Sequence, residues 1–580
     1  MIESKAFHRK IEVAFAGLAP GSARVDACLL AILAGAAALR FASLDAAPPG
    51  INQDEALSAW NGWCLLKTGH ALSGEPWPIF HCRNIGDYPT MLFFYLLIPF
   101  QWLFGLSVWS TRLPAALAGI GAVACAWDVG RRLAGPAAGR WAALAMALSP
   151  WSVFLGHFGT GASVGPLQAL LPLSLLARSG LVPALDSGPT ASLGAGAGPR
   201  RLTPPRWLWA LLAGLAFGLG TYGFHSLRVQ LPLTLAAAIL VSPASPRGIA
   251  SQPGARAGLF ALSLGFLAPF LPLALVSLAD PDSLRRWQMT RLWAPDAPAW
   301  NVVRLVAERW VIHFAPDFLF VRGDHYSVLN PARIGALSWW MLPGLLAGGL
   351  LLLARFVREP RARLLLALLA LYPVGDLVSA NEGVHSLRSA AGLPALALVL
   401  GFGTKELLGW LARRGRGVAI AATAVLLALA GAETARTGTR FFRDGVRDRT
   451  TQIEYQAALL EASRWLGPRL GPDDHVFCTT TGMNQPFVIV LVGLRYDPAR
   501  WLADSKDVVH AGFDRYRGFG RFHFIYDDTA QAIAQALELD GRPERAWFLV
   551  RPGEYSMTDP VRRITAPNGE EMLWVCVRQL

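Results

Sequence analysis

The sequence predicts a polytopic α-helical membrane protein with about 11 to 13 transmembrane helices, followed by a small C-terminal α/β domain. Of the 580 residues, 53% are hydrophobic and only 16% are charged, whereas soluble chains usually carry about 25% charged residues. Apolar runs alternate with short arginine clusters over most of the chain, and the composition changes after Gly431. These observations exclude an ordinary cytosolic enzyme, a disordered chain and a coiled coil.

We interpret the net charge of +13 as a signal that orients the chain in the membrane. The basic residues gather in short loops between apolar runs, which is how polytopic membrane proteins retain positive loops in the cytoplasm. Only five of the 53 basic residues are lysine, so arginine is used throughout and a single arginine is weak evidence for a site. We therefore expect membrane lipids, and no nucleic acid, among the partners.

The first predicted span is Ala27–Leu44, which follows a basic N-terminal segment, residues 1–26. No small-residue cleavage site stands directly behind its apolar core, so we interpret it as a retained span and not as a signal peptide. The N-terminus is then cytoplasmic.

Ten further apolar runs predict the remaining spans. Several are shorter than the roughly 17 to 25 residues that cross the hydrocarbon core, so their helices must extend into the flanking residues. The runs are Val108–Gly130, Trp141–Phe158, Gly165–Ala177, Trp207–Tyr222, Val229–Val241, Leu259–Leu278, Ile334–Leu353, Leu364–Val378, Ala390–Gly403 and Val418–Gly431.

Charge sorts the connecting loops into two sets. Loops around Arg131, Arg200, Arg247, Arg355 and Arg413 carry arginine clusters and are predicted to be cytoplasmic. With eleven crossings, successive loops alternate between the cytoplasmic and the external side without exception, and the C-terminal domain lies outside. The external segments are then 45–107, 159–163, 223–228, 279–333 and 380–389, with the membrane domain at 27–433 and the extracytoplasmic domain at 434–580.

The segment Met91–Phe104 is apolar enough to enter the bilayer. Counting it as one complete crossing would place all later loops on the wrong side by the positive-inside pattern. We interpret it as a juxtamembrane or re-entrant helix, and two helices in its place would raise the count to thirteen.

Beyond Gly431, charged residues are frequent and the apolar runs shrink, as expected of a soluble domain of about 140 residues. A Gly/Ala/Pro/Ser-rich stretch within Ser179–Arg206 is typical of a flexible linker, and we assign it no chemistry. The tail is predicted to contain strands at Val476–Thr481, Phe487–Leu494, Phe522–Tyr526, Ala546–Val550 and Met572–Val577, and helices near Gln452–Leu466 and Thr529–Leu539.

Four cysteines fall in predicted external segments: Cys64 and Cys82 in the first loop, and Cys478 and Cys576 in the tail. An external location permits two disulfides. Four free, buried thiols are an equal alternative, because spacing does not reveal connectivity.

The first external loop is the most informative segment. Asn52 is a suitable N-cap, Asp54 and Glu55 follow in the first turn, and a helical pattern continues through Leu66 to a C-cap at Thr68-Gly69. Acidic residues stabilise a helix N-terminus without any catalytic role. The local pattern alone therefore leaves helix stabilisation and catalysis both open.

Several motifs in this region carry a resemblance. They are Pro-Pro-Gly-x-x-x-Asp-Glu-Ala, Leu-Leu-Lys-Thr-Gly, Asp-Tyr-Pro before an aromatic run, Leu-Phe-Gly-Leu-Ser and Thr-Arg-Leu-Pro, all between Pro48 and Leu133. In this order they resemble the protein mannosyltransferase and aminoarabinose transferase group of GT-C membrane glycosyltransferases, which use polyprenyl-phosphate sugars. Tyr222–Arg228 and His385–Pro394 are similar to external motifs of the group, whereas the tail matches none.

The resemblance implies a GT-C-like fold in which Asp54 is the catalytic carboxylate. Such an enzyme needs a base that deprotonates the acceptor hydroxyl. Glu55 is expected to orient the acceptor, to assist Asp54 or to help hold a divalent cation, Mg²⁺ or Mn²⁺. Asp87, Tyr88 and Tyr222 are the candidates for acceptor contact, and Asp87 also for the metal.

A phosphate leaving group requires stabilisation of negative charge. Arg83, Arg228 and Arg388, with His225 and His385 beside the last two, are the candidates for binding the donor phosphate. An external arginine can instead simply meet lipid headgroups. The sequence His-Ser-Leu-Arg occurs at 225–228 and again at 385–388, both at external span ends, which favours a functional role.

The sequence has no Walker motif and no nucleotide-binding glycine signature, which argues against a nucleotide-sugar donor. We therefore expect an integral-membrane glycosyltransferase that transfers a monosaccharide from a polyprenyl phosphate to an extracytoplasmic acceptor, with inversion. A flippase or transporter of a lipid-linked sugar and a non-catalytic cell-envelope assembly protein are the alternatives. The heavy use of Ala, Arg and Gly suggests a bacterial plasma membrane, whereas sugar and acceptor stay open.

Overall fold

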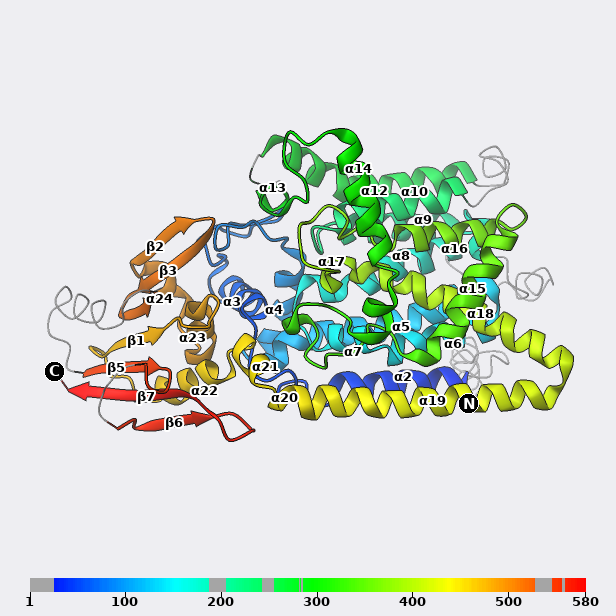
Figure 1. The fold of residues 1–580 in the computed structure, drawn as a ribbon. Helices are drawn as coiled ribbons and strands as arrows, with labels where there is room; N and C mark the ends of the chain where they lie inside the picture. The colour runs from blue at the N-terminus through cyan, green and yellow to red at the C-terminus, as the bar shows by residue number, and fades with distance from the viewer. Residues whose placement is uncertain are drawn as a thin grey trace, which may run out of the picture.

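The computed structural model describes residues 26–186, 205–241, 255–280, 282, 285–526, 545–554 and 559–579. A helical body forms one part of the molecule, and a smaller domain built on a β-sheet lies at one end of it (Figure 1). The predicted fold class, a helical membrane protein with a C-terminal α/β domain, is confirmed.

Each of the eleven predicted apolar runs overlaps a helix of the body, and the run Trp141–Phe158 is divided between two helices at Ser149. The body also contains helices outside these runs. The helices are α2 (Ala27–Phe41), α3 (Gln53–Thr68), α4 (Leu92–Phe104), α5 (Val108–Ala134), α6 (Pro136–Leu148), α7 (Pro150–Gly156), α8 (Gly165–Ser179), α9 (Arg206–Gly220), α10 (Leu227–Val241), α12 (Ala255–Ala279), α13 (Arg285–Thr290), α14 (Ala299–Ile312), α15 (Leu342–Arg355), α16 (Pro360–Leu371), α17 (Ser386–Ser389), α18 (Leu393–Arg414) and α19 (Arg416–Thr439).

Among the described residues, four helices are long and apolar enough to cross a membrane, and five shorter apolar helices accompany them. The four are Val108–Ala134, Ala255–Ala279, Ser386–Arg414 and Arg416–Arg447. Small residues let the helices approach closely, as is common in membrane bundles. A Cβ added to Gly214 of α9, for example, would lie 2.2 Å from the Leu262 carbonyl oxygen of α12.

Helix α4 corresponds to the segment that we interpret as juxtamembrane or re-entrant. Its 13 residues span about 20 Å, less than the roughly 30 Å of the hydrocarbon core. It packs against α3, and the Gln101 Nε2 donates a hydrogen bond to the Ala59 carbonyl at 2.8 Å. The juxtamembrane interpretation stays a prediction.

The C-terminal domain holds one seven-stranded sheet in the order β2-β3-β4-β1-β5-β7-β6. Strand β1 is parallel to β4 and β5, and the other pairs are antiparallel. The elements are α20 (Gly445–Arg447), α21 (Arg449–Glu454), α22 (Ala457–Leu466), β1 (His475–Thr479), α23 (Pro486–Leu494), α24 (Pro498–Ala503), β2 (Lys506–Ala511), β3 (Phe513–Phe519), β4 (Phe522–Ile525), β5 (Arg545–Val550), β6 (Arg562–Thr565) and β7 (Glu571–Gln579).

The sequence prediction of this domain is correct for β1, β4, β5 and β7, and wrong at Phe487–Leu494, which is helix α23. All but one residue of α23 is buried, so its sequence is apolar on every side and lacks a helical period. The predicted helix Gln452–Leu466 is interrupted at Gln456, whose φ of 45° ends α21 before α22 begins. The predicted helix Thr529–Leu539 and most of the linker lie outside the described residues.

The predicted domain boundary at 433/434 falls inside α19, which continues without a break to Thr439. All six cysteines are free thiols, and those at 64, 82, 478 and 576 are buried. The structure therefore has the second arrangement left open by the sequence, four buried thiols.

The segments predicted to be external lie together at one end of the helical body. The Ile51 N–H donates to the Tyr455 carbonyl at 2.8 Å, and the Trp501 Nε1 donates to the Leu72 carbonyl at 2.9 Å. One hydrophobic cluster contains Trp60 of α3 together with Phe487 of α23. The C-terminal domain thus shares a core with the first external loop and fixes the helix that carries Asp54.

Candidate active site

Helix α3 forms as the sequence predicts. The Asn52 Oδ1 accepts a hydrogen bond from the Asp54 N–H at 3.0 Å, and the Asn52 N–H donates to the Glu55 carboxylate at 3.2 Å. This reciprocal capping box satisfies two N–H groups at the helix start. The helix ends at Gly69, whose φ of 72° closes the C-cap.

The surroundings of Glu55 argue against its predicted catalytic or metal-binding role. Its side chain is fully buried and accepts hydrogen bonds from Arg112 Nε at 2.8 Å and Arg112 Nη2 at 2.9 Å. The Gly159 N–H donates to the same carboxylate at 2.8 Å. Four N–H groups, one of them from the Asn52 cap, therefore donate to the two carboxylate oxygens of Glu55. They leave no open face toward an acceptor or a cation.

Arg112 extends this anchor to the chain before α3. Its guanidinium also donates to the carbonyls of Leu44, Pro48 and Gly50 at 3.2, 2.8 and 3.1 Å. The sequence places Arg112 in the Thr-Arg-Leu-Pro motif, 57 residues after Glu55. The pair fixes the backbone on both sides of Asp54.

The Asp54 side chain is exposed and has no hydrogen-bond partner for its carboxylate in the described part of the chain. Although the carboxylate reaches solvent, the surrounding protein desolvates it and raises its pKa above the usual range. The positive charge of Arg286 opposes this rise, whereas the negative charges of Asp87 and Glu55 add to it. Asp54 is therefore an open carboxylate in the first external loop.

Asp87 pairs with Arg286 of α13, with 2.8 Å between the carboxylate and Arg286 Nη1. Its other oxygen accepts the Tyr88 N–H at 2.8 Å. The Tyr88 hydroxyl donates to Asp282 at 2.6 Å, and burial together with this carboxylate raises the pKa of Tyr88 to about 12. Arg286 was not among the residues predicted from the sequence, because it is one of several arginines in the large external loop.

The two His-Ser-Leu-Arg segments meet at Gly375. A Cβ added there would lie 2.0 Å from the Arg388 carbonyl oxygen and 2.9 Å from the Ser226 Cβ. The fully buried Asp376 orders the second segment, because it accepts the His385 N–H at 3.0 Å and lies 3.3 Å from Arg309. The structure thus brings together the two repeats that are about 160 residues apart in the sequence.

Arg228 differs from the other arginines of this cluster. Its Nε and Nη2 atoms are buried and find no hydrogen-bond partner among the described residues. By contrast, Arg388 Nη1 lies 3.9 Å from Asp376, and Arg388 also donates to the Asn381 side chain. A buried guanidinium without an anion is costly, so Arg228 is suited to binding an anionic ligand.

The two histidines of the repeats are uncharged. Burial, together with the positive charges of neighbouring residues such as Arg228, lowers the pKa of His225 to about 3. Burial likewise lowers the pKa of His385 to about 3. Both imidazoles are therefore neutral at physiological pH and can take part in hydrogen bonds without adding charge.

Two further predicted residues have protein partners. Arg83 is partly exposed and contacts Asp514 of the C-terminal domain at 3.2 Å, which argues against its predicted role in binding the donor phosphate. The Tyr222 hydroxyl donates to the Pro269 carbonyl at 2.8 Å, so it is already engaged. Both residues contribute contacts between parts of the chain.

The described residues contain no group of three or more His, Cys, Asp or Glu side chains placed to hold a metal ion. The pair expected from the sequence does not fit, because Glu55 is saturated by Arg112 and Asp87 is paired with Arg286.

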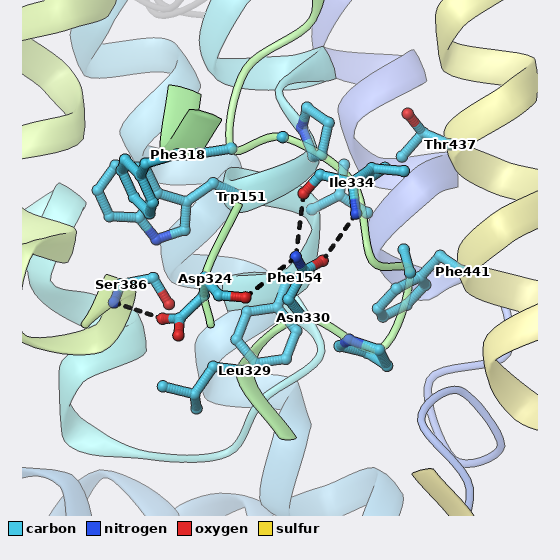
Figure 2. Close-up of a pocket in the computed structure, with 16 residues that line it drawn as sticks. Trp151, Phe154, Phe318, Asp324, Leu329, Asn330, Ile334, Ser386, Thr437 and Phe441 are labelled. Atoms are coloured by element: carbon cyan, nitrogen blue, oxygen red, sulfur yellow. Dashed lines mark hydrogen bonds between the residues drawn. The ribbon is translucent and has the colours of Figure 1, made fainter. Parts of the chain in front are cut away.

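A small cavity of about 30 Å³ lies elsewhere, between α7 and the segment 329–336 (Figure 2). Asp324 lies at its edge, and its carboxylate accepts the Ser386 N–H at 2.6 Å at the start of α17. Burial raises the pKa of Asp324 to about 6. Neither Asp54 nor Arg228 lines this cavity, although Ser386 of the second His-Ser-Leu-Arg repeat does.

Comparisons with known proteins agree with this architecture. A family model described as dolichyl-phosphate-mannose-protein mannosyltransferase matches residues 87–196. The crystal structure of ArnT from Cupriavidus metallidurans in the apo state aligns with a TM-score of 0.51 at 15% identity, covering 94% of this chain and 97% of ArnT. The chain has a GT-C fold.

Other solved structures are similar. The archaeal oligosaccharyltransferase AglB from Archaeoglobus fulgidus, in complex with an inhibitory peptide and a dolichol-phosphate, aligns with a TM-score of 0.50 at 11% identity, covering 90% of this chain and 69% of AglB. ArnT bound to undecaprenyl phosphate aligns with a TM-score of 0.47 at 15% identity, covering 95% and 98%. No match was found among the curated proteins. The resemblance predicted from the motifs between Pro48 and Leu133 is confirmed.

Proposed function

We propose that this protein is an integral-membrane glycosyltransferase that transfers a monosaccharide from a polyprenyl-phosphate donor to an extracytoplasmic acceptor. Its GT-C fold and the match of residues 87–196 to a mannosyltransferase family model support this function. The related AglB structure contains a dolichol-phosphate, a lipid of the proposed donor class. We place the protein in the bacterial plasma membrane with a cytoplasmic N-terminus and the site outside.

The observation that carries the proposal is an open carboxylate in the first external loop together with an unmatched cation in the external segment 223–228. The Asp54 carboxylate and the Arg228 guanidinium have no protein partner in the described structure. The two segments are in contact, because the Thr90 hydroxyl of the first external loop donates to the Gly223 carbonyl at 2.7 Å. A donor with a phosphate to bind and an acceptor with a hydroxyl to deprotonate would together satisfy both groups.

In the proposed reaction, the acceptor hydroxyl attacks the anomeric carbon of the donor sugar from the face opposite the phosphate. Asp54 accepts the hydroxyl proton as the new carbon–oxygen bond forms. The bond between the anomeric carbon and the phosphate oxygen breaks, and the polyprenyl phosphate leaves with the electron pair. Arg228, with Arg388 nearby in the same cluster, stabilises the developing negative charge, and the anomeric configuration is inverted.

The variant Asp54→Asn tests the assignment of the base. An amide cannot accept the proton, so we expect transfer to fall at least about 100-fold, the low end of the usual contribution of general base catalysis. The full chain, purified in lipid nanodiscs, is incubated with a panel of undecaprenyl-phosphate monosaccharides and with membrane extract as acceptor source. Release of undecaprenyl phosphate and formation of the glycoside are both measured.

Glu308→Gln is the matched control, because Glu308 is an exposed acid on α14 outside the cluster. It should leave the rate unchanged. Full activity of Asp54→Asn refutes Asp54 as the base. Movement of the lipid-linked sugar across the bilayer without any glycoside would instead support the flippase alternative.

A further inference from the structure

Helix α14 in the large external loop exposes a stripe of large apolar side chains. Trp300 and Val303 are each 68% exposed, Val311 is 61% exposed and Trp310 is 37% exposed. Spacings of three, seven and eight residues place these four side chains on one face of a helix. Large apolar side chains that gather on an exposed face mark an interaction surface.

The rest of the exposed side of α14 is polar. Arg304 Nη1 lies 3.1 Å from the Glu308 carboxylate, and both side chains are exposed. Arg304 Nη2 also donates to the Asn301 side chain at 3.0 Å. The ion pair has no net charge and lies beside the apolar stripe. The exposed half of the helix is therefore divided along its length into an apolar strip and a polar strip.

The segment that contains α14 is attached to the external end of the predicted span Leu364–Val378. Before the helix, the Leu292 N–H donates to the Val378 carbonyl at 2.9 Å. In its last turn, the Trp310 Nε1 donates to the Ala370 carbonyl at 2.9 Å. Between these contacts α14 runs across the direction of α19 (Figure 1). The helix therefore lies along the end of the bundle, parallel to the predicted membrane surface.

The opposite face of α14 supports the second His-Ser-Leu-Arg segment. Arg309 is buried, with its Nη2 3.3 Å from the Asp376 carboxylate and its Nη1 donating to the Asn381 carbonyl at 2.8 Å. His313, directly after the helix, has its Nε2 3.4 Å from the same carboxylate. Asp376 in turn accepts the His385 N–H. One helix thus joins the exposed apolar stripe to the segment that carries Arg388.

We propose that α14 is an interfacial helix whose apolar stripe inserts into the external leaflet of the membrane, and that this lipid contact holds Arg309 on Asp376. Tryptophan is enriched at membrane–water interfaces, and a helix with one apolar face lies in the plane of the interface. The ion pair beside the stripe is neutral, so apolar contact provides the binding and an anionic lipid is not required. The catalytic meaning of the link to Asp376 rests on the proposed function.

The position of α14 can be measured with nitroxide labels on the full chain in nanodiscs of phosphatidylethanolamine and phosphatidylglycerol. Val303→Cys places a label on the apolar stripe, and Glu308→Cys places the matched label on the polar strip. The native thiols that are not buried are removed by Cys28→Ala and Cys125→Ala. We expect the label at 303 to be accessible to oxygen and protected from a water-soluble nickel chelate. The label at 308 should show the reverse.

Equal access of the nickel chelate to both labels overturns the interfacial position. Protection of the label at 303 from both reagents, with dipolar broadening between chains, shows that a second copy covers the stripe and also overturns it. These measurements need no substrate. They therefore stand apart from the proposed function, which fails when Asp54→Asn keeps full transfer activity.

The link to Asp376 is tested by Val303→Lys/Val311→Lys, which places two charges on the stripe and disfavours its insertion. A nitroxide at Trp300→Cys in this variant should become accessible to the nickel chelate, and the KM for the undecaprenyl-phosphate sugar should rise several-fold. Val561→Lys, at an exposed apolar residue of the C-terminal domain, is the control and should leave KM unchanged. An unchanged KM in a double variant whose label has become accessible overturns the link.

Discussion

Asp54 and Glu55 are neighbours in the sequence, but their side chains meet opposite surroundings. Glu55 is fully buried on Arg112, whereas Asp54 is exposed and open. The sequence was sufficient to predict the helix, its caps and the presence of both acids in the first turn. It did not separate their roles, because the residue that captures Glu55 is 57 positions away on α5.

The Glu55–Arg112 pair should be a large contributor to stability. Glu55→Gln leaves the guanidinium of Arg112 buried without its anion, and breaking such a pair costs about 3 to 5 kcal/mol. We expect a clearly lowered thermal transition of the detergent-solubilised chain. The double variant Glu55→Gln/Arg112→Met should recover part of the loss, because it removes the unpaired charge. A transition equal to that of the wild type would contradict the anchoring role.

Arg228 and Arg286 show a second limit of sequence reasoning at this scale. The repeated His-Ser-Leu-Arg motif was enough to single out Arg228 and Arg388. Only the structure shows that Arg388 has a carboxylate nearby while two nitrogens of Arg228 are buried without a partner. Arg286 carries no motif and is one of 48 arginines, so its position beside Asp87 could not be predicted.

At the scale of elements, hydrophobic period and caps predicted the helices of the body well. The same reasoning failed for α23, because a helix buried on all sides has no polar face to set a period. It also missed β2 and β3, whose strands carry charged residues on an exposed face. These two strands form the hairpin that reaches the site, so the part of the fold that was hardest to predict bears on function.

The close contact between Gly86 and the hairpin gives an element-scale prediction. Gly86 has a φ of 78°, and a Cβ there would approach the Gly512 carbonyl oxygen to 2.8 Å. Gly86→Ala should therefore destabilise the docked hairpin by about 1 kcal/mol or more. We expect faster limited proteolysis between β2 and β3 than in the wild type.

Gly553→Ala is the control, because it has a similar φ of 78° but no atom within 4 Å of an added Cβ. The Gly553→Ala variant has the same strain of a positive φ but lacks the steric clash that Gly86→Ala makes with the Gly512 carbonyl oxygen. Equal proteolysis at the hairpin in both variants would contradict a tight contact between Gly86 and the turn.

For the whole molecule, the positive-inside pattern predicted which segments belong together. The structure places the first external loop, the large external loop and the C-terminal domain at one end of the body, where they share hydrogen bonds and ion pairs (Figure 1). Charge patterning could predict this common side because the positive-inside pattern depends on the charges of the loops and not on tertiary contacts. The docking of the sheet domain on α3 could not be predicted, since the tail has no recognisable motif.

The proposed orientation predicts which sites a membrane-impermeant maleimide labels in intact cells. Arg322→Cys in the large external loop, whose side chain is 80% exposed, should be labelled from outside. Arg413→Cys at the end of α18 is also exposed but should be labelled only after the cells are opened. The reverse pattern would contradict the orientation and would place the site in the cytoplasm.

The central claim, that Arg228 binds the donor phosphate beside Asp54, is tested most directly by a structure of the full chain with bound undecaprenyl phosphate. We predict a phosphate oxygen within hydrogen-bond distance of the Arg228 guanidinium, with the phosphate on the side of the site that faces Asp54. A lipid phosphate bound away from both residues, with Arg228 still unpartnered, would contradict the account.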